Sequence, residues 1–212
     1  MPLRSQLPGY SPLSARALAR SLASVLPGTP EPVEVLRSLL TDRFGGRALL
    51  LGSGTQALQA ALQLATRVPG LGDSPVALPA YSCFDLITAA AGAGVKVDFY
   101  DLDPATLSPD MDSLDRVLAR GARVVVAGNL YGLPLDWDDV RSRVEAVGGL
   151  LIEDAAQGLG SAWRGGEGGT FGGLTVLSFG RGKGWTGGGG GALLLRDPRV
   201  LTDDRSWTRQ AG

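Results

Sequence analysis

The strongest constraint on the fold is an alternation along the chain between short strand-like runs and segments with helical periodicity. Strand-like runs rich in apolar residues occupy 47–51, 76–78, 95–101, 123–128, 150–154, 174–179 and 192–196. Helical patterns occupy 55–67, 85–94, 108–120 and 136–148. Because strands that alternate with helices form parallel sheets covered on both faces, the sequence predicts an α/β fold: a three-layer α/β/α domain with a mostly parallel sheet. No helical pattern separates the last two strands, so we expect one of them to run antiparallel or to lie at an edge.

The chain is long enough for one large domain. It has 212 residues, of which 44% are hydrophobic, and it shows neither an internal repeat nor a clear linker. We expect residues 41–212 to form this domain and the largely helical segment 1–40 to be an N-terminal arm.

Composition excludes several classes of function. The net charge of −1, with acids and bases interspersed, indicates neither a nucleic acid nor a membrane as a partner. A single cysteine, Cys83, excludes an internal disulfide framework, and the polar, proline-containing N-terminus is unlike a signal peptide. We therefore expect a cytoplasmic protein. The absence of histidine excludes Ser-His-Asp and Cys-His catalysis, and no set of ligands predicts a metal site.

One lysine stands out among the basic residues. Lys183 and Lys96 are the only two lysines, and the other eighteen basic residues are arginines. Arginine keeps its proton, whereas a lysine amine can be neutralised by its surroundings and can form a Schiff base. Lys183 could be an exposed loop charge, but in a chain so rich in arginine its choice favours a role for the amine itself.

Residues that could bind a ligand or take part in a reaction follow or end three of the expected strands. The turn GSGT (52–55) opens a helix, Asp154 ends the strand at 150–154, and Lys183 follows the strand at 174–179. In parallel sheets ligands bind beyond the carboxyl ends of strands, and a helix start with glycine and hydroxyl groups suits a phosphate. Each feature has a simpler explanation: a helix cap at the turn, another cap at Asp154, and a flexible tip for the glycine run 187–191.

Together, the amine, the carboxylate and the anion cradle match what pyridoxal phosphate requires: a lysine for its aldehyde, an acid for its ring nitrogen and a phosphate site. The apolar strands on both sides of the glycine run also favour close backbone approach over a linker. The P-loop and dinucleotide-binding fingerprints do not fit, since Gly184 follows Lys183 and the turn GSGTQA lacks a third glycine.

These motifs resemble, in order along most of the chain, those of the DegT/DnrJ/EryC1/StrS family of sugar aminotransferases, which are pyridoxal-phosphate enzymes of fold type I. The matching segments are LGSGTQALQAAL (51–62), the stretch 76–110 with its PAYSCF, NLYGLPLD (129–136), LLIEDAAQGLG (150–160) and SFGRGK (178–183) followed by the glycine-rich turn. The EDAAQ block and the SFxxxK block at this separation are specific to the family.

The resemblance implies a set of roles. Lys183 would hold the cofactor as a Schiff base and shuttle a proton, and Asp154 would pair with the ring nitrogen. Gln157 would lie near the 3′ oxygen of the ring. The remaining implied cofactor contacts are phosphate binding by Gly54, Thr55 and Ser178, turn support by Ser53, and ring stacking at the slot of Cys83, with Phe84 as the aromatic candidate.

The resemblance also implies an amino transfer from glutamate or glutamine to a nucleotide-linked keto sugar, in a homodimer. Three positions depart from the family pattern: Asn129 replaces a histidine, Gly184 an asparagine and Gly189 a glutamate. The second, smaller domain of the family is expected to be absent. Two alternatives therefore stay open: a non-catalytic or split-enzyme domain that needs a partner chain, and a dehydratase, which Lys183 disfavours because known dehydratase relatives replace that lysine.

Overall fold

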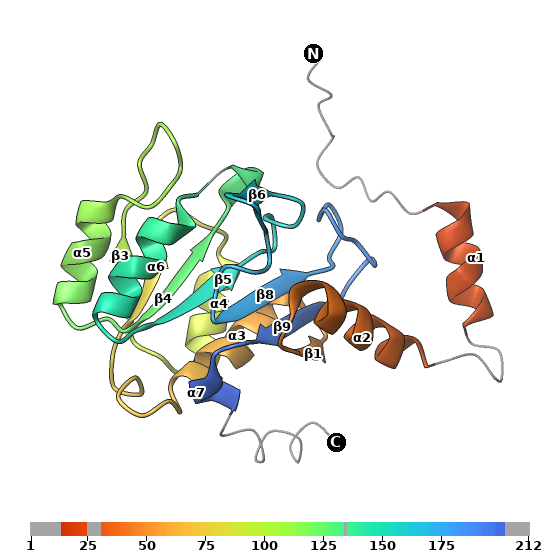
Figure 1. Cartoon of the computed structure of the whole chain (residues 1–212), viewed down its shortest axis with the longest axis horizontal. Helices are drawn as coiled ribbons and strands as arrows, with labels where there is room; N and C mark the ends of the chain where they lie inside the picture. The colour runs from red at the N-terminus through yellow and green to blue at the C-terminus, as the bar shows by residue number, and fades with distance from the viewer. Residues whose placement is uncertain (1–13, 25–30, 134, 202–212) are drawn as a thin grey trace.

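A seven-stranded sheet forms the centre of the computed structural model, which describes residues 14–24, 31–133 and 135–201 (Figure 1). Its strands are β1 (Arg47–Leu51), β2 (Val76–Pro79), β3 (Val97–Tyr100), β4 (Val124–Gly128), β5 (Leu150–Asp154), β8 (Leu174–Ser178) and β9 (Gly191–Leu195). The order across the sheet is β1-β9-β8-β5-β4-β2-β3. A separate hairpin pairs β6 (Ala162–Trp163) with β7 (Gly166–Glu167).

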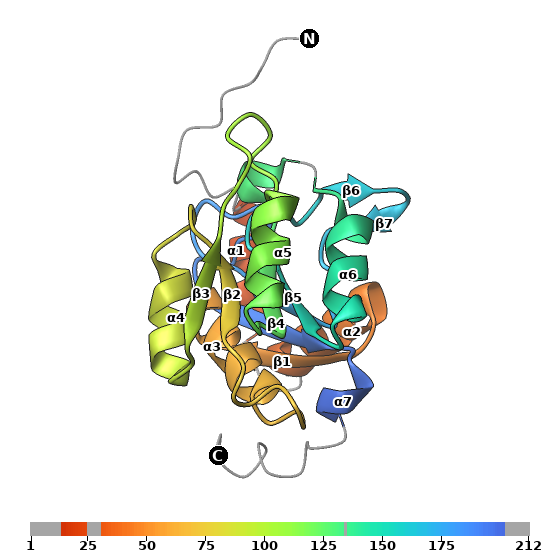
Figure 2. The same ribbon diagram turned by 90° about the vertical axis from the view of Figure 1, so that its left-hand side faces the viewer.

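Helices cover both faces of the sheet, as Figure 2 shows, so the predicted three-layer α/β/α fold is confirmed. Helices α3 (Gly54–Ala65) and α4 (Asp85–Ala93) pack on one face. Three helices pack on the other: α2 (Pro32–Phe44), α5 (Met111–Ala119) and α6 (Trp137–Ala146). The remaining helices are α1 (Ala15–Ala23), the 3₁₀ turn η1 (Leu130–Gly132) and α7 (Pro198–Leu201).

Burial on both faces explains why the central strands read as continuous apolar runs. In β5, Leu150 and Ile152 pack against the α3 side, whereas Leu151 faces α5 and α6. Strand β4 repeats this alternation and pairs with β5 in parallel register. A strand covered by helices on both faces is mostly apolar, which is the pattern of β4 and of the first three residues of β5.

Strand β9 runs antiparallel to both of its neighbours, as one of the last two strands was expected to do. It does not lie at an edge, because it is inserted between β1 and β8. At its start, a Cβ on Gly191 would lie 2.5 Å from backbone atoms of Ser53. The glycine run therefore allows three strand ends to approach one another closely, and it leads directly into a strand.

The N-terminal segment is helical where the structure describes it. Helix α1 buries none of its residues and stands apart from the sheet in Figure 1. Helix α2 buries Leu40 and Phe44 against the sheet, so it continues past the expected boundary at residue 40. The rest of the expected arm, 1–13 and 25–30, lies outside the described residues, and the division into arm and domain stays a prediction. Among the described helices, none is long and apolar enough to cross a membrane.

Candidate functional site

A pocket of about 360 Å³ lies at the carboxyl ends of the parallel strands. This volume falls in the range of about 300–1,000 Å³ that is usual for small-molecule sites. Eight residues singled out from the sequence line it: Ser53, Gly54, Thr55, Cys83, Asp154, Gln157, Ser178 and Lys183. The fold therefore brings together residues that lie as far as 130 positions apart in the chain.

The turn before α3 forms one wall of the pocket. The Ser53 hydroxyl caps the helix by accepting a hydrogen bond from the Gln56 amide at 3.1 Å, and Gln56 Oε1 in turn accepts one from the Gly52 amide at 3.0 Å. The amides of Gly54 and Thr55 start the helix, where no intrahelical acceptor precedes them. Since the first turn carries no acidic residue, these amides and the helix dipole suit an anion.

Close packing between this turn and β8 completes the cradle. A Cβ on Gly54 would lie 2.8 Å from Ser178 Cβ and 3.0 Å from Ser178 Oγ. Only glycine fits there without displacing Ser178, and the serine hydroxyl is held next to the start of α3. Two helix-start amides without an intrahelical acceptor and a hydroxyl beside them match the donors that a phosphate group needs.

Asp154 ends β5 and lies in the same pocket. Its Oδ1 accepts a hydrogen bond from the Ala156 amide at 3.0 Å, so it caps a turn and not a helix. Burial raises the pKa of the carboxyl above its ordinary value and Asp85 adds to that rise, while the Ala156 amide and the Lys183 charge oppose it. An acid in this setting gains from any positive charge that enters the pocket.

The two lysines have different surroundings. Lys183 is partly buried and lines the pocket, in the loop between β8 and β9, whereas Lys96 is exposed at the start of β3. Lys183 is also close enough to Asp154 to lower the pKa of that carboxyl. The amine and the acid that the sequence suggested thus face one cavity.

Gln157 is oriented by an unusual backbone conformation. Its Oε1 accepts a hydrogen bond from the Tyr131 amide, and Tyr131 has a left-handed φ of 56°. With the oxygen engaged in this way, the Nε2 group is the end of the side chain available to a ligand acceptor. The Tyr131 hydroxyl lies 3.4 Å from that of Tyr81, and this contact raises the pKa of Tyr131.

Of the two residues expected beside the cofactor ring, Cys83 lies in the pocket and Phe84 does not. Cys83 lines the pocket, and its Sγ donates to Asp85 Oδ2 at 3.3 Å. Phe84 is the N-cap residue of α4, is 77% exposed and does not line the pocket. The backbone turn into the helix directs it away from the cavity, so the structure does not support ring stacking by Phe84.

Two further residues line the pocket: Tyr100, which was not expected there, and Asn129, which departs from the family pattern. Tyr100 ends β3, is buried, and donates its hydroxyl proton to the Val126 carbonyl at 2.8 Å. Burial, and secondarily Asp154, raise the pKa of Tyr100. Asn129 donates to the Leu133 carbonyl at 2.7 Å, and its Oδ1 accepts no hydrogen bond from any residue that the structure describes. The signal that could have found Tyr100 is its place at a strand's carboxyl end.

Comparison with known proteins identifies the family. The model of the DegT/DnrJ/EryC1/StrS aminotransferase family matches residues 43–210. The chain belongs to this family. The match covers the sheet and the whole pocket, so the resemblance based on the quoted motifs is confirmed.

Individual relatives within the family differ in their reactions. A dTDP-4-dehydro-2,3,6-trideoxy-D-glucose 4-aminotransferase of Saccharopolyspora spinosa is 32% identical over 63% of this chain and 34% of its own length. A GDP-4-keto-6-deoxy-D-mannose 3-dehydratase of Yersinia pseudotuberculosis is 28% identical over 76% of this chain and 42% of its own. The sugar aminotransferase CalS13 of Micromonospora echinospora has a TM-score of 0.76 and 27% identity over 87% of this chain and 53% of its own. The chain spans less than half the length of these two curated relatives.

Proposed function

We propose that this chain binds pyridoxal 5′-phosphate and forms the cofactor-binding part of an aminotransferase, which transfers an amino group from glutamate or glutamine to a nucleotide-linked keto sugar. The observation that carries the proposal is the convergence of an amine, an acid and a glycine-built anion cradle on one pocket. Family membership supports it, as does the sugar nucleotide in the name of the Saccharopolyspora relative. A homodimer is proposed on the family resemblance alone.

Six groups of this chain would hold the cofactor. The amides of Gly54 and Thr55 and the Ser178 hydroxyl would bind the phosphate, because the missing Cβ of Gly54 lets the turn pack directly against Ser178. Asp154 would face the ring nitrogen. Burial raises its pKa, so a protonated ring nitrogen beside it would favour the ionised carboxylate.

Gln157 would donate from Nε2 to the 3′ oxygen of the ring, since its Oε1 is already engaged by the Tyr131 amide. The cofactor, when bound, supplies an aldehyde that joins amines and a ring that withdraws electrons from the substrate carbon. Lys183 would provide the amine that holds the cofactor and afterwards carry the proton to and from the substrate carbon. Its position suits both tasks, because the amine lines the same cavity as the acid and the phosphate cradle.

Two other functions remain candidates within the family. The dehydratase names among the relatives favour elimination, but the retention of Lys183 favours amino transfer. A cofactor-binding part that acts with a partner chain is the second candidate, and it rests on the family resemblance. In that case the chain would bind the cofactor without completing the reaction by itself.

A single-turnover experiment separates these functions. The chain is incubated with pyridoxal phosphate and, in separate reactions, with glutamate or glutamine, and the 2-oxo acid formed per chain is measured. One equivalent from either donor, lost in Lys183→Ala and kept in Lys96→Ala, is the result expected for an aminotransferase. Cofactor binding without 2-oxo acid from either donor would contradict independent amino transfer and favour the cofactor-binding part.

A further inference from the structure

Two neighbours in the loop between β8 and β9 face opposite sides. Lys183 lines the pocket, and Trp185, two residues later, packs on the other side of the loop beneath helix α2. We infer that Trp185 is a positioning residue for Lys183. The packing of the Trp185 ring against α2 sets how far the Lys183 amine reaches into the pocket. This inference rests on the proposed function, because that function requires the amine to meet a ligand aldehyde.

Side chains from outside the loop hold the Trp185 ring in place. Its ring lies 5.6 Å from the Phe44 ring, at an angle of 56° between the ring planes. The Arg43 guanidinium lies over the ring of Trp185, with its Cζ 4.9 Å from the centroid. Arg43 also pairs with Glu167 of the small hairpin, so the guanidinium is held in place from a second direction. Such contacts with an aromatic face are attractive and geometrically specific.

The rest of the loop offers little to fix it. Residues 180–190 include seven glycines, and Trp185 is their only aromatic or aliphatic side chain. Gly182, Gly188 and Gly190 have positive φ angles, which suit glycine and leave the unanchored backbone many alternatives. Backbone hydrogen bonds hold both sides of the loop, from the Lys183 amide to Gly180 and from the Gly187 amide to Phe179. The Thr186 hydroxyl adds a hydrogen bond to the Phe179 carbonyl and accepts one from the Gly188 amide, so without the tryptophan the loop would be held by hydrogen bonds and by no packed side chain of its own.

Displacement of the amine should reduce its reaction with an aldehyde much more than it reduces ligand binding. A misplacement of about 1 Å can slow a positioned reaction about a hundredfold. The phosphate cradle belongs to the turn before α3 and to β8, and none of its groups contacts Trp185. Loss of Trp185 should therefore separate two properties: covalent capture by Lys183 and non-covalent binding of the phosphorylated ring.

The test compares two ligands on three variants. Pyridoxal phosphate, with borohydride reduction and mass spectrometry of the Lys183 peptide, gives the rate of covalent capture. Pyridoxine phosphate has the same ring and phosphate but an alcohol in place of the aldehyde, so its dissociation constant reports binding alone. The variants are Trp185→Ala, Trp185→Phe and, as a matched control, Trp163→Ala, which removes another partly buried tryptophan with an arginine over its ring.

For Trp185→Ala we expect capture to slow by about tenfold to a hundredfold, with pyridoxine phosphate affinity within about threefold of the unaltered chain. Trp185→Phe, which keeps a ring against Phe44, should restore most of the rate, and Trp163→Ala should leave it unchanged. Equal capture by Trp185→Ala and the unaltered chain would overturn the inference alone, as would a parallel loss of binding and capture. Absence of capture in the unaltered chain would overturn the proposed function, and the inference with it.

Discussion

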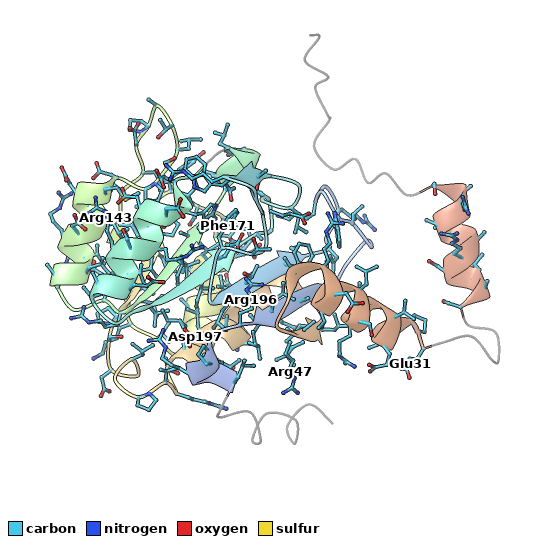
Figure 3. The ribbon with its side chains drawn as sticks, in the orientation of Figure 1. Glu31, Arg47, Arg143, Phe171, Arg196 and Asp197 are labelled. Atoms are coloured by element: carbon cyan, nitrogen blue, oxygen red, sulfur yellow. The ribbon has the colours of Figure 1, made fainter. Side chains whose placement is uncertain are left out.

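Adjacent carboxylates in β5 should respond to substitution in opposite directions, because one is a structural anchor and the other belongs to the pocket. Glu153 is fully buried on the face opposite to Asp154 and holds the loop between β7 and β8. Its carboxylate accepts hydrogen bonds from the amides of Gly169, Phe171 and Gly172 and from the Thr175 hydroxyl. Arg196 lies 4.0 Å away and also contacts Thr175, and Figure 3 shows it close to the sheet beside α2.

The contacts of Glu153 give the size of the expected loss in the free energy of unfolding. Removal of one partner from a buried charged network costs about 3–5 kcal/mol, since the opposite charge is left without compensation. Glu153→Ala should therefore lower the free energy of unfolding by about 3–5 kcal/mol. In Glu153→Gln the side-chain oxygen can keep the three bonds now accepted by Oε2, but the side-chain NH2 group, a donor, would face the Gly169 amide, also a donor. A single unsatisfied buried donor costs about 1–3 kcal/mol, which is our expectation for this variant.

Urea unfolding of the unaltered chain and both variants, with equal slopes, measures these differences. Circular dichroism of the variants in the absence of urea checks that each is folded before the comparison is made. A loss below about 1 kcal/mol for Glu153→Ala would refute the anchoring role. A larger loss for Glu153→Gln than for Glu153→Ala would refute the hydrogen-bond assignment.

Three further predictions concern the pocket. Burial raises the pKa of the Asp154 carboxyl in the folded chain above its value in the unfolded chain. The folded chain therefore loses stability as pH rises from the unfolded-state pKa through the folded-state pKa. Asp154→Asn should be more stable than the unaltered chain to urea at neutral pH, with no gain well below about pH 4. Gly54→Ala should weaken inorganic phosphate binding at least about tenfold by calorimetry because its Cβ displaces Ser178, whereas Gly187→Ala, whose nearest contact would be 3.7 Å away, should not. Pyridoxal phosphate should slow alkylation of Cys83, followed by mass spectrometry, and an unchanged rate would place the ligand elsewhere.

The sequence predicted the strands because their signal is local. Strand β5 was expected at 150–154 and occupies Leu150–Asp154, since the apolar run 150–152 is typical of a strand buried on both faces. The insertion of β9 between β1 and β8 could not be predicted, because pairing with a strand about 140 residues earlier leaves no local pattern. The motifs did find the pocket's amine, acid and turn, each of which directly follows or ends a predicted strand.

Side-chain direction was the weakest part of the sequence analysis. Cys83 and Phe84 are neighbours, yet the turn into α4 places one in the pocket and the other in solvent. Tyr100 was missed for a related reason: its hydroxyl reaches past β2 to the Val126 carbonyl on β4, a contact set by the order of the strands. Trp185 was likewise unremarkable in sequence, because its seat comes from α2, more than 130 residues earlier.

The most direct test of the central claim is covalent capture of pyridoxal phosphate by the unaltered chain. Borohydride reduction, proteolysis and mass spectrometry identify the modified lysine, and the chain offers its own control in the exposed Lys96. The account predicts one pyridoxyl group per chain on the peptide that contains Lys183, absent in Lys183→Ala and retained in Lys96→Ala. A folded chain that carries no adduct, or carries it on Lys96, would contradict the account.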